Sequence, residues 1–419
     1  SKKLAQEVGV NSVPGDLEVL RDADHAARVA ESLGYPVMLK ASAGGGGKGM
    51  RVAYTEAELR EGFTSAVNEA KSSFADGRVF AEKFIEQPRH IEIQLLADSH
   101  GNCIYLGERE CSIQRRHQKV IEEAPSPFLD EKTRRAMGEQ AMALARAVDY
   151  RSAGTVEFIV DKDLNFYFLE MNTRLQVEHP VTEMVYGVDL VEQMIRIAAG
   201  EPMALSQEEI CADGWAIECR LYAEDPYRNF MPSIGRLVRC QPPKQSDTVR
   251  VDTGVVEGSE ITVFYDPMIA KLITRGQDRA AAISAMAAAL DSYYVRGINH
   301  NLSFLSALIT HPRFVEGRLT TALIDEEYPD GFAGAPREGI VLEALLAASI
   351  LMHHRRVRHE GTIDCKLRNY RPTLGVEWVV CLEGTHHEVT VADVEDGFDI
   401  SLGEQLIAVR SDWRPGQRL

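Results

Sequence analysis

The sequence is poor in positive charge and has no long apolar run. Its 419 residues include 46 Lys and Arg against 63 Asp and Glu, which gives a formal net charge of −17 at pH 7. Such an acidic chain repels nucleic acids and anionic membranes, so we expect neither as a partner. The longest nearly apolar stretch, residues 339–352, contains Glu343 and is too short to span a bilayer. Any anionic substrate must therefore be held by a local group of basic residues.

Closely spaced cysteines are also missing. The 7 cysteines are scattered from Cys103 to Cys381, and none belongs to a C-x-x-C pair. An odd number of isolated cysteines argues against a disulfide framework or a structural zinc site and favours a reducing compartment. The chain starts at Ser1, without Met or a leader pattern, and its first residues are typical of a helix. We therefore expect a fragment or a processed chain.

The remaining pattern predicts a mixed α/β and α+β protein. Residues 1–85 alternate between helix and strand patterns, and residues 86–332 form the longest block. A Pro- and Gly-rich stretch, residues 328–337, is typical of a linker. Residues 333–419 then form a small α+β unit. Its expected elements are an apolar helix at 338–354 and short strands at 376–382, 388–394 and 405–410, with the last strand incomplete at the end of the chain.

Two details of the long block follow from periodicity and capping. Ile91, Ile93 and Leu95 alternate with polar residues, so we expect them to share the buried face of a strand. Asp278 precedes an alanine-rich segment and is a typical N-cap, and that helix should stop before Gly297.

A glycine-rich loop follows the expected strand that ends at Lys40. Because glycine has no Cβ atom, its backbone N–H groups can approach and bind phosphate oxygens. The loop is not a Walker A motif, since Lys48 is followed by glycine. The alternative interpretation is a flexible surface loop. We interpret it as a phosphate-binding loop with Lys40 as a fixed cation; its residues are Gly44, Gly45, Gly46, Gly47, Lys48 and Gly49.

A basic cluster stands out in this acidic chain. Residues 114–119 read QRRHQK and include Gln114, His117 and Lys119. Amide, guanidinium, imidazole and ammonium donors together suit an anion with several oxygens. The alternative is a solvated, charged loop.

Two carboxylates are expected to face each other across a hairpin. Residues 154–160 and 166–172 read as strands, and a four-residue loop at 162–165 would place Glu157 opposite Glu170. Directly opposed side chains lie close together, so two carboxylates there favour a shared cation such as Mg²⁺ or Mn²⁺. The alternative is a solvent-exposed polar face in another register.

The second strand continues the same rhythm. If the chain stays extended, one face carries five polar groups: Glu170, Asn172, Arg174, Gln176 and Glu178. On that face Asn172 can join the metal, Arg174 can hold an anion and Glu178 can act as a base. Farther along, Arg220 lies on an alternating strand, where it can stabilise negative charge. The alternative for Arg220 is a structural ion pair with Glu224 or Asp225.

Together these motifs resemble the biotin carboxylases of the ATP-grasp superfamily. The most specific strings are residues 170–183, EMNTRLQVEHPVTE, and residues 110–119. The resemblance covers about residues 1–332 and implies an ATP-grasp lid in 1–85 and a catalytic subdomain in 86–332. It also implies an activity: ATP and bicarbonate form carboxyphosphate, and the carboxyl group then passes to biotin.

The resemblance further implies a role for each matching residue. ATP phosphates are held by Lys40 and the loop Gly44–Gly49; the rest of the nucleotide is faced by Glu82, Lys83, Ile85, His90, Gln114 and His117. The metal matches Glu157, Glu170 and Asn172, and bicarbonate matches Lys119, Arg174, Gln176 and Val177. Glu178 matches the base that deprotonates bicarbonate, and Arg220 matches the group that stabilises the biotin enolate.

The chain departs from the family pattern at both ends. It begins inside the pattern, so the N-terminal subdomain is absent, and it has no Met-Lys-Met biotinylation motif. The biotin carrier domain is therefore expected downstream or on another chain. A catalytically inactive assembly fragment and another ATP-grasp ligase remain alternatives.

The segment after residue 335 narrows the resemblance to one subfamily. It resembles the α subunits of propionyl-CoA carboxylases, in which a helix surrounded by a β-barrel docks the carboxyltransferase β subunit. This implies a hetero-oligomer, located in a bacterial cytoplasm or alternatively in the mitochondrial matrix. The α subunits of methylcrotonyl-CoA carboxylases are the close competitor.

Overall fold

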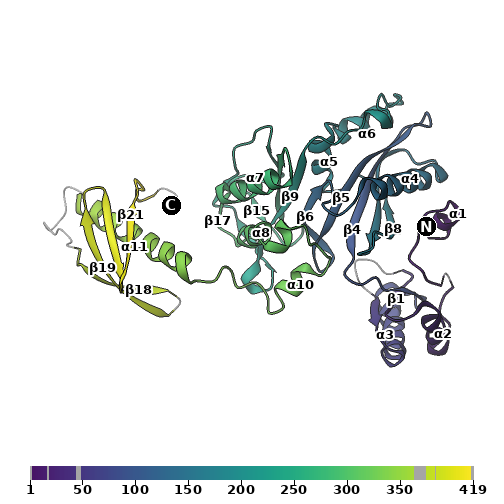
Figure 1. Ribbon diagram of the computed structural model, residues 1–419, viewed down its shortest axis with the longest axis horizontal. Coiled ribbons are helices and arrows are strands. Elements are labelled where there is room, and N and C mark those ends of the chain that lie inside the picture. Colours follow the sequence, from purple (N-terminus) through teal and green to yellow (C-terminus); the bar gives the residue numbers. More distant parts are fainter. Residues whose placement is uncertain (1, 17, 44–48, 363–373, 383, 417–419) are drawn as a thin grey trace. The chain divides into compact units, whose positions relative to one another are not determined.

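The protein is described by a computed structural model that covers residues 2–16, 18–43, 49–362, 374–382 and 384–416. Gly44, Gly45, Gly46, Gly47 and Lys48 of the predicted phosphate loop lie outside the described residues. The chain divides into two compact units, Ser1–Ala333 and Gly334–Leu419, which are described separately (Figure 1). The predicted division of the first unit between residues 85 and 86 stays a prediction.

A small sheet begins the first unit. Strands β1 (Val37–Ala41), β2 (Met50–Ala53) and β3 (Val79–Lys83) pair antiparallel in the order β2-β1-β3. Helices α2 (Ala23–Leu33) and α3 (Glu56–Phe74) lie side by side against it (Figure 1). Both helices begin at a capping side chain: Asp22 accepts from the backbone N–H of His25, and Thr55 accepts from that of Glu58. The short helix α1 (Lys2–Glu7) precedes them.

An antiparallel sheet of eight strands forms the centre of the first unit. Its order is β14-β16-β9-β6-β5-β4-β7-β8. The strands are β4 (Arg89–Ala97), β5 (Cys103–Arg115), β6 (Gln118–Ala124), β7 (Ser152–Val160), β8 (Phe166–Asn172), β9 (Trp215–Tyr222), β14 (Val249–Thr253) and β16 (Met268–Gly276).

Helices cover both faces of the central sheet. On one face α4 (Glu131–Ala147) packs through Met137 and Ala141 in the same core as Ile91, Ile93 and Leu95, as their spacing predicts. On the other face lie α5 (His179–Tyr186) and α6 (Leu190–Ala198) (Figure 1). Because both faces are covered, polar groups on the inner strands are buried and must find partners within the protein.

Smaller elements complete the first unit. Asp278 caps α7 (Arg279–Ser292) by accepting from the N–H of Ala281, and the helix stops before Gly297, as predicted. The other elements are α8 (Leu302–Ile309), α9 (Pro312–Val315), α10 (Leu323–Glu327), β10 (Glu224–Asp225), β11 (Met231–Pro232), β12 (Gly235–Arg236), β13 (Arg239–Gln241), β15 (Glu260–Ile261) and β17 (Tyr294–Arg296).

The second unit is one helix on one sheet. Helix α11 (Gly339–Thr362) extends farther than the predicted 338–354. Its partner is a meander of β18 (Glu377–Leu382), β19 (Thr385–Val394), β20 (Gly397–Leu402) and β21 (Gln405–Arg410). The core contains Ile350, Leu351, Val389, Val391, Phe398, Ile400 and Val409. The described strands form an open sheet, so closure into a barrel stays a prediction.

The second unit contains one strand that was not predicted. Strand β20 was missed, although Phe398 and Ile400 alternate as buried strand residues do. The last described strand, β21, pairs with β20 along its whole length and ends at Arg410, and the incompleteness of the unit stays a prediction.

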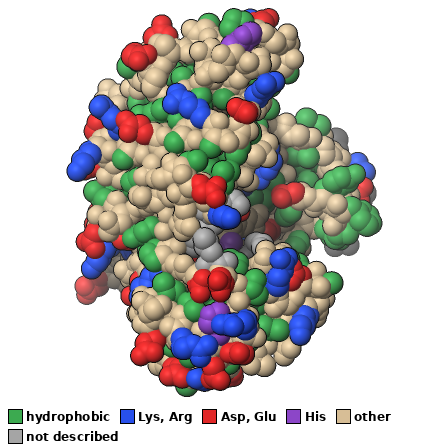
Figure 2. Space-filling view, turned by 90° about the vertical axis from the view of Figure 1, so that its right-hand side faces the viewer, with side chains coloured by type: hydrophobic (Ala, Val, Ile, Leu, Met, Phe, Trp, Pro, Cys, Tyr) green, Lys and Arg blue, Asp and Glu red, His purple; other side chains and the backbone are tan. Residues whose placement is uncertain are grey.

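Two features concern the expected absence of nucleic-acid and membrane partners: the charge of the surface and the apolar character of the helices. On the face shown in Figure 2, acidic and basic side chains are interspersed with apolar ones. Among the described residues, no helix combines the length and the apolar character that a membrane crossing needs.

Candidate active site

The hairpin β7–β8 brings the two predicted carboxylates into register. Glu157 lies directly opposite Glu170, which confirms the prediction. The route to this pairing differs from the expected one, because Val160 pairs with Phe166 and the loop therefore has one more residue than assumed. A β-bulge at Leu169 takes up the extra residue and restores the predicted register at the site.

The two opposed carboxylates have different surroundings. Glu170 is exposed, whereas Glu157 is buried. Glu157 accepts hydrogen bonds from Gln176 Nε2 at 2.8 Å and Asn172 Nδ2 at 3.1 Å. Its other oxygen lies 3.0 Å from His90 Nε2. Burial alone would raise the pKa of Glu157, but contacts with His90 and Lys119 outweigh it and hold this pKa below its ordinary value.

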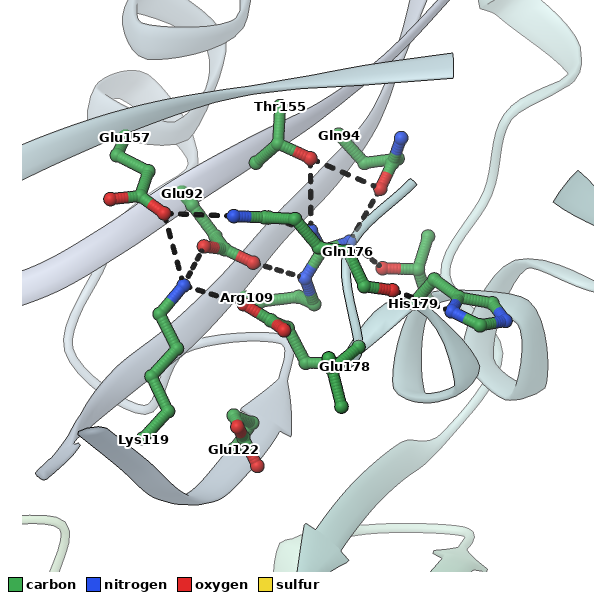
Figure 3. Close-up of polar contacts among 12 residues, drawn as sticks. Glu92, Gln94, Arg109, Lys119, Glu122, Thr155, Glu157, Gln176, Glu178 and His179 are labelled. Carbon is green, nitrogen blue, oxygen red and sulfur yellow. Dashed lines mark hydrogen bonds and ion pairs between the residues drawn. The ribbon is translucent and has the colours of Figure 1, made fainter. Parts of the chain in front are cut away.

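Lys119 joins three carboxylates at the centre of the site. Its ammonium Nζ lies 2.6 Å from Glu92, 3.1 Å from Glu157 and 2.5 Å from Glu178 (Figure 3). Burial opposes the charged form, but these carboxylates, Glu92 above all, raise the pKa of Lys119 well above its ordinary value. The lysine is therefore a half-buried cation that keeps three neighbouring anions together.

Glu178 lies between two cations. One oxygen accepts from Lys119 and the other accepts from Arg220 Nη2 at 2.9 Å. Burial would raise the pKa of Glu178, but Lys119, Arg220 and Arg109 outweigh it and lower this pKa. The carboxylate is thus ionised at neutral pH, as a general base must be.

The predicted continuous polar face of residues 170–178 was wrong. Strand β8 ends at Asn172, and Glu178 is the N-cap of α5 with φ −81° and ψ 8°, which is not an extended conformation. Leu175 is half-buried and packs against the apolar cluster that contains Leu190 and Ile197 of α6. Gln176 and Glu178 are nevertheless buried at the site, while Arg174 is exposed and donates to Asn172 Oδ1 at 3.2 Å.

Arg220 belongs to the site and is no isolated structural pair. It donates through Nε to Glu122 at 2.6 Å and through Nη2 to Glu178. Glu224, the alternative partner, instead accepts from Arg115 at 2.6 Å. Arg220 therefore links Glu178 to a second buried carboxylate.

Glu122 and Glu218 form a buried pair beside Arg220. They lie directly opposite each other on β6 and β9, and both are fully buried. Within the described ranges, neither oxygen of Glu218 has a hydrogen-bond partner. Burial raises the pKa of Glu218 well above its ordinary value, and the facing Glu122 raises it further.

The predicted nucleotide residues are distributed over two sheets. In the small sheet Lys40 forms an ion pair with Glu82, and Lys83 Nζ donates to the carbonyls of Gly34 and Tyr35 at 2.9 and 2.8 Å. Ile85 is half-buried just after β3. In the large sheet Gln114 Nε2 contacts His90 Nδ1 at 2.8 Å, His117 is exposed in the β5–β6 turn, and Val177 accepts from Lys271 Nζ at 2.7 Å.

Several site residues escaped the sequence reasoning. Glu92, Arg109, Glu122, Glu218 and Lys271 are all buried beside the predicted residues. A charged residue within an otherwise buried strand was the available signal, but spacing along the chain does not say which strands become neighbours.

Two groups of ligand-type atoms among the described residues are compact enough for a metal ion, and the second consists of Glu92, Cys111 and Glu178. Atoms of His90, Glu92 and Glu157 lie within 4.8 Å of one another. Of the predicted metal set, Glu157 and Asn172 are in contact and Glu170 faces Glu157. The oxygen atoms of these three residues are of the kind that Mg²⁺ prefers, so the residues fit such an ion.

Solved structures share this fold and much of the sequence. The biotin carboxylase domain of a 2-oxoglutarate carboxylase from Hydrogenobacter thermophilus, solved with MgADP, ADP and bicarbonate, is 46% identical with a TM-score of 0.74; the match covers 78% of this chain and 72% of that one. A biotin carboxylase from Campylobacter jejuni matches with the same identity, TM-score and coverage. This chain belongs to the biotin carboxylase family. The family predicted from residues 110–119 and 170–183 is thus confirmed.

Family models divide the biotin carboxylase chain into three matches. Residues 1–206 match the carbamoyl-phosphate synthase L chain ATP binding domain, and residues 218–326 match the biotin carboxylase C-terminal domain. Residues 345–419 match the propionyl-coenzyme A carboxylase BT domain.

Curated relatives extend the likeness over the whole chain. The propionyl-CoA carboxylase alpha chain of Ruegeria pomeroyi is 58% identical over 100% of this chain, and the human mitochondrial one is 52% identical over 99%. A methylcrotonoyl-CoA carboxylase subunit alpha from Dictyostelium discoideum is 49% identical over 77%. The chain spans 64% of the Ruegeria relative and 57% of the human one.

Proposed function

We propose that this chain carries the biotin-carboxylating site of a propionyl-CoA carboxylase α subunit, which uses ATP and bicarbonate. One observation carries the chemical part of this proposal. Glu178 is a buried, ionised carboxylate that contacts Lys119 on one side and Arg220 on the other. A base with cations on both sides suits a reaction in which an anion is first deprotonated and negative charge then develops nearby.

In the first step, we infer that Glu178 accepts the proton of bicarbonate. Lys119, Arg174 and Gln176, with the backbone of Val177, hold the anion in place. The bicarbonate oxygen that lost its proton attacks the γ-phosphorus of ATP, the bond to ADP breaks, and carboxyphosphate forms. Because Lys119 and Arg220 offset part of the negative charge of Glu178 and its neighbours, they reduce the repulsion that a further anion meets at the site.

The metal would be held by Glu157, Glu170 and Asn172, where Mg²⁺ or Mn²⁺ neutralises phosphate charge and orients the nucleotide. Lys40, the loop Gly44–Gly49, Glu82, Lys83, Ile85, His90, Gln114 and His117 are proposed to bind the rest of ATP.

In the second step, we infer that Arg220 stabilises the negative charge that develops on the ureido oxygen of biotin. Glu122 holds the guanidinium from behind, so Arg220 keeps its place when Glu178 takes up a proton. Carboxyphosphate breaks its C–O bond to give CO2 and phosphate, the phosphate takes the proton of biotin N1′, and N1′ then bonds to the carbon of CO2. Biotin itself is proposed to arrive on a carrier domain outside this sequence.

The second unit is proposed to dock the carboxyltransferase β subunit within a hetero-oligomer. The match of residues 345–419 to a BT domain and the apolar residues on its surface support this role. Deleting residues from 336 onward in the full-length protein should leave carboxylation of free biotin intact and abolish co-purification with the β subunit. A complex that survives the deletion would place docking elsewhere.

The activity is tested by the substrates that ATP cleavage requires. The purified full-length protein should cleave ATP only when bicarbonate and free biotin are both present. Cleavage without biotin would favour another ATP-grasp ligase, and a folded protein without cleavage would favour an inactive assembly role.

The acyl group is tested in the assembled complex. Propionyl-CoA should be carboxylated faster than methylcrotonyl-CoA, and the reverse order would reassign the subfamily. The compartment is proposed to be a bacterial cytoplasm or a mitochondrial matrix, since bacterial and mitochondrial relatives both exist.

A further inference from the structure

We propose that Arg109 is a positioning residue for the bicarbonate step, an inference that rests on the proposed function. Its side chain is fully buried on β5 and touches none of the predicted nucleotide-binding residues of the small sheet. It instead fixes Gln176 and Glu92, and through them Lys119 and Glu157 (Figure 3). The geometry thus assigns it to the order of the bicarbonate site.

Every donor of the guanidinium is used. An arginine side chain has five N–H groups. In this protein Nε donates to Glu92 Oε1 at 2.5 Å, Nη1 to Gln94 Oε1 and Thr182 Oγ1 at 2.7 and 2.9 Å, and Nη2 to Thr155 Oγ1 and Gln176 Oε1 at 3.2 and 2.9 Å. The acceptors come from β4, β7, α5 and the segment before α5. The planar guanidinium of Arg109 therefore acts as a rigid fork that holds four parts of the fold in place.

One arm of this fork sets the orientation of the Gln176 amide. Its oxygen accepts from Arg109 Nη2, so its Nε2 must point the other way, where it donates to Glu157 at 2.8 Å. The reverse orientation would place two N–H groups against a guanidinium and leave the carbonyl facing a carboxylate. The same Nε2 has a second N–H, which an oxygen of bicarbonate can accept.

The other arm sets the place of Lys119. Glu92 accepts from Arg109 through Oε1 and from Lys119 Nζ through Oε2 at 2.6 Å. Glu92 is fully buried, so its carboxylate cannot turn to water for another partner. Fixing Glu92 therefore fixes the ammonium group that contacts Glu157 and the base Glu178.

Lysine cannot replace this arginine. An ammonium group has three donors on one atom, so at least two of the five acceptors would lose a partner. Buried acceptors without donors are costly, and Gln176 would be free to turn its amide. The expected effect is on bicarbonate more than on the nucleotide.

The test uses steady-state ATP cleavage by the full-length protein as bicarbonate and ATP are varied. Arg109→Lys should raise the KM for bicarbonate roughly 10- to 100-fold, while the KM for ATP changes by less than about threefold. The matched control is Arg279→Lys, because Arg279 also grips a buried carboxylate, Glu123, at 2.7 and 2.9 Å and donates to two carbonyls. That control should leave both KM values unchanged.

A milder variant covers the case in which Arg109→Lys does not fold. Thr182→Val removes one acceptor of Arg109 on α5 without a change of shape, and it should raise the KM for bicarbonate by about 2- to 5-fold. An unchanged bicarbonate KM in either folded variant overturns the proposal, as does an equal rise in both KM values. If the wild type itself shows no bicarbonate-dependent cleavage, the proposed function fails and the role of Arg109 fails with it, whereas an unexpected result confined to the variants leaves the proposed function intact.

Discussion

The two units differ in what their interiors hold besides apolar side chains. The first unit gathers the buried Glu92, Arg109 and Glu178 around the half-buried Lys119, and each has at least two charged or hydrogen-bonding partners. The core of the second unit is almost wholly apolar, with Phe398 among its most buried side chains. Burying an ion costs several kcal/mol unless the ion is paired. A cluster of buried ions is therefore expected where the chemistry of the protein requires it.

Large apolar side chains are exposed on both units. In the second unit Ile340, Val379 and Leu406 are 79%, 63% and 65% exposed, and in the first unit Phe264 and Tyr265 are 85% and 83% exposed. Such groups favour contact with another protein. The ionic cluster of the first unit is therefore what distinguishes the two units, and each of the following changes should affect one of them and spare the other.

The largest expected effect comes from the base. Glu178→Gln keeps the size of the side chain and removes its basicity, so bicarbonate-dependent turnover should fall by roughly 10²- to 10⁴-fold with ATP affinity nearly unchanged. Stopped assays of ATP cleavage and nucleotide titration measure the two quantities. Glu131→Gln, at an exposed carboxylate of α4, is the control and should behave as wild type. Lost ATP affinity with turnover spared would give Glu178 another role.

Next comes a cavity in the second unit. Phe398→Ala should destabilise that unit by about 3–5 kcal/mol, because a large buried ring is removed. Calorimetry should show an earlier transition for this unit, while ATP cleavage with free biotin stays at its wild-type rate. The exposed Val379→Ala should change stability by less than about 0.5 kcal/mol. A simultaneous loss of cleavage would show that the units do not act independently.

A smaller effect is expected from the opposed carboxylates. Glu170→Gln or Glu157→Gln should raise the Mg²⁺ or Mn²⁺ concentration needed for half-maximal ATP cleavage by about tenfold, the worth of roughly one metal–oxygen contact. Glu170→Gln is the cleaner change, since Glu170 is exposed and Glu157 also contacts Lys119. An unchanged metal concentration for half-maximal ATP cleavage would show that this hairpin does not bind the metal.

The smallest effect tests whether a buried carboxylate needs a cation. Among the described residues, the hydrogen-bond donors of Asp98 include no cation. Burial would raise the pKa of Asp98, but N–H donors of Met203, Asn102 and His100 outweigh it and lower this pKa to about 2. A lowered pKa stabilises the fold above the ordinary value of 3.8, and this contribution is lost as the pH falls from there towards 2.

Asp98→Asn should therefore cost about 1 kcal/mol at pH 7, with allowance for solvent screening near this surface turn. In urea titrations the gap from wild type should begin to narrow below about pH 4. A gap that is the same at pH 7 and pH 3 would mean that the ionised form is not the stabilising one.

Local rules predicted what local spacing controls. Ile91, Ile93 and Leu95 lie on one face because a strand alternates, and Asp278 caps α7 because the helix N-terminus needs an acceptor. The site string around Glu178 was recognised because its residues are contiguous. The opposition of Glu157 and Glu170 was thus predicted, although the assumed loop was one residue too short, and the role of Glu178 as base stays a prediction.

Contacts between distant strands could not be predicted in this way. Arg109 and Gln176, or Arg220 and Glu122, meet only because of the order β9-β6-β5-β4-β7-β8. The polar face predicted through Arg174 failed because β8 ends at Asn172 and the chain turns into α5 at Glu178, so the alternation of a strand does not apply there. The periodicity of apolar residues describes one strand or helix, whereas the site is assembled from several of them.

The β-bulge at Leu169 shifts the pairing register of β7 and β8 by one residue. Without it, the pairing of Phe158 with Phe168 would continue as Glu157 with Leu169, and Glu170 would face Val156. The two carboxylates would then point to opposite faces of the sheet. The unpaired Leu169 therefore decides whether Glu157 and Glu170 face each other. The length of the loop predicts this register only when the bulge is counted as well.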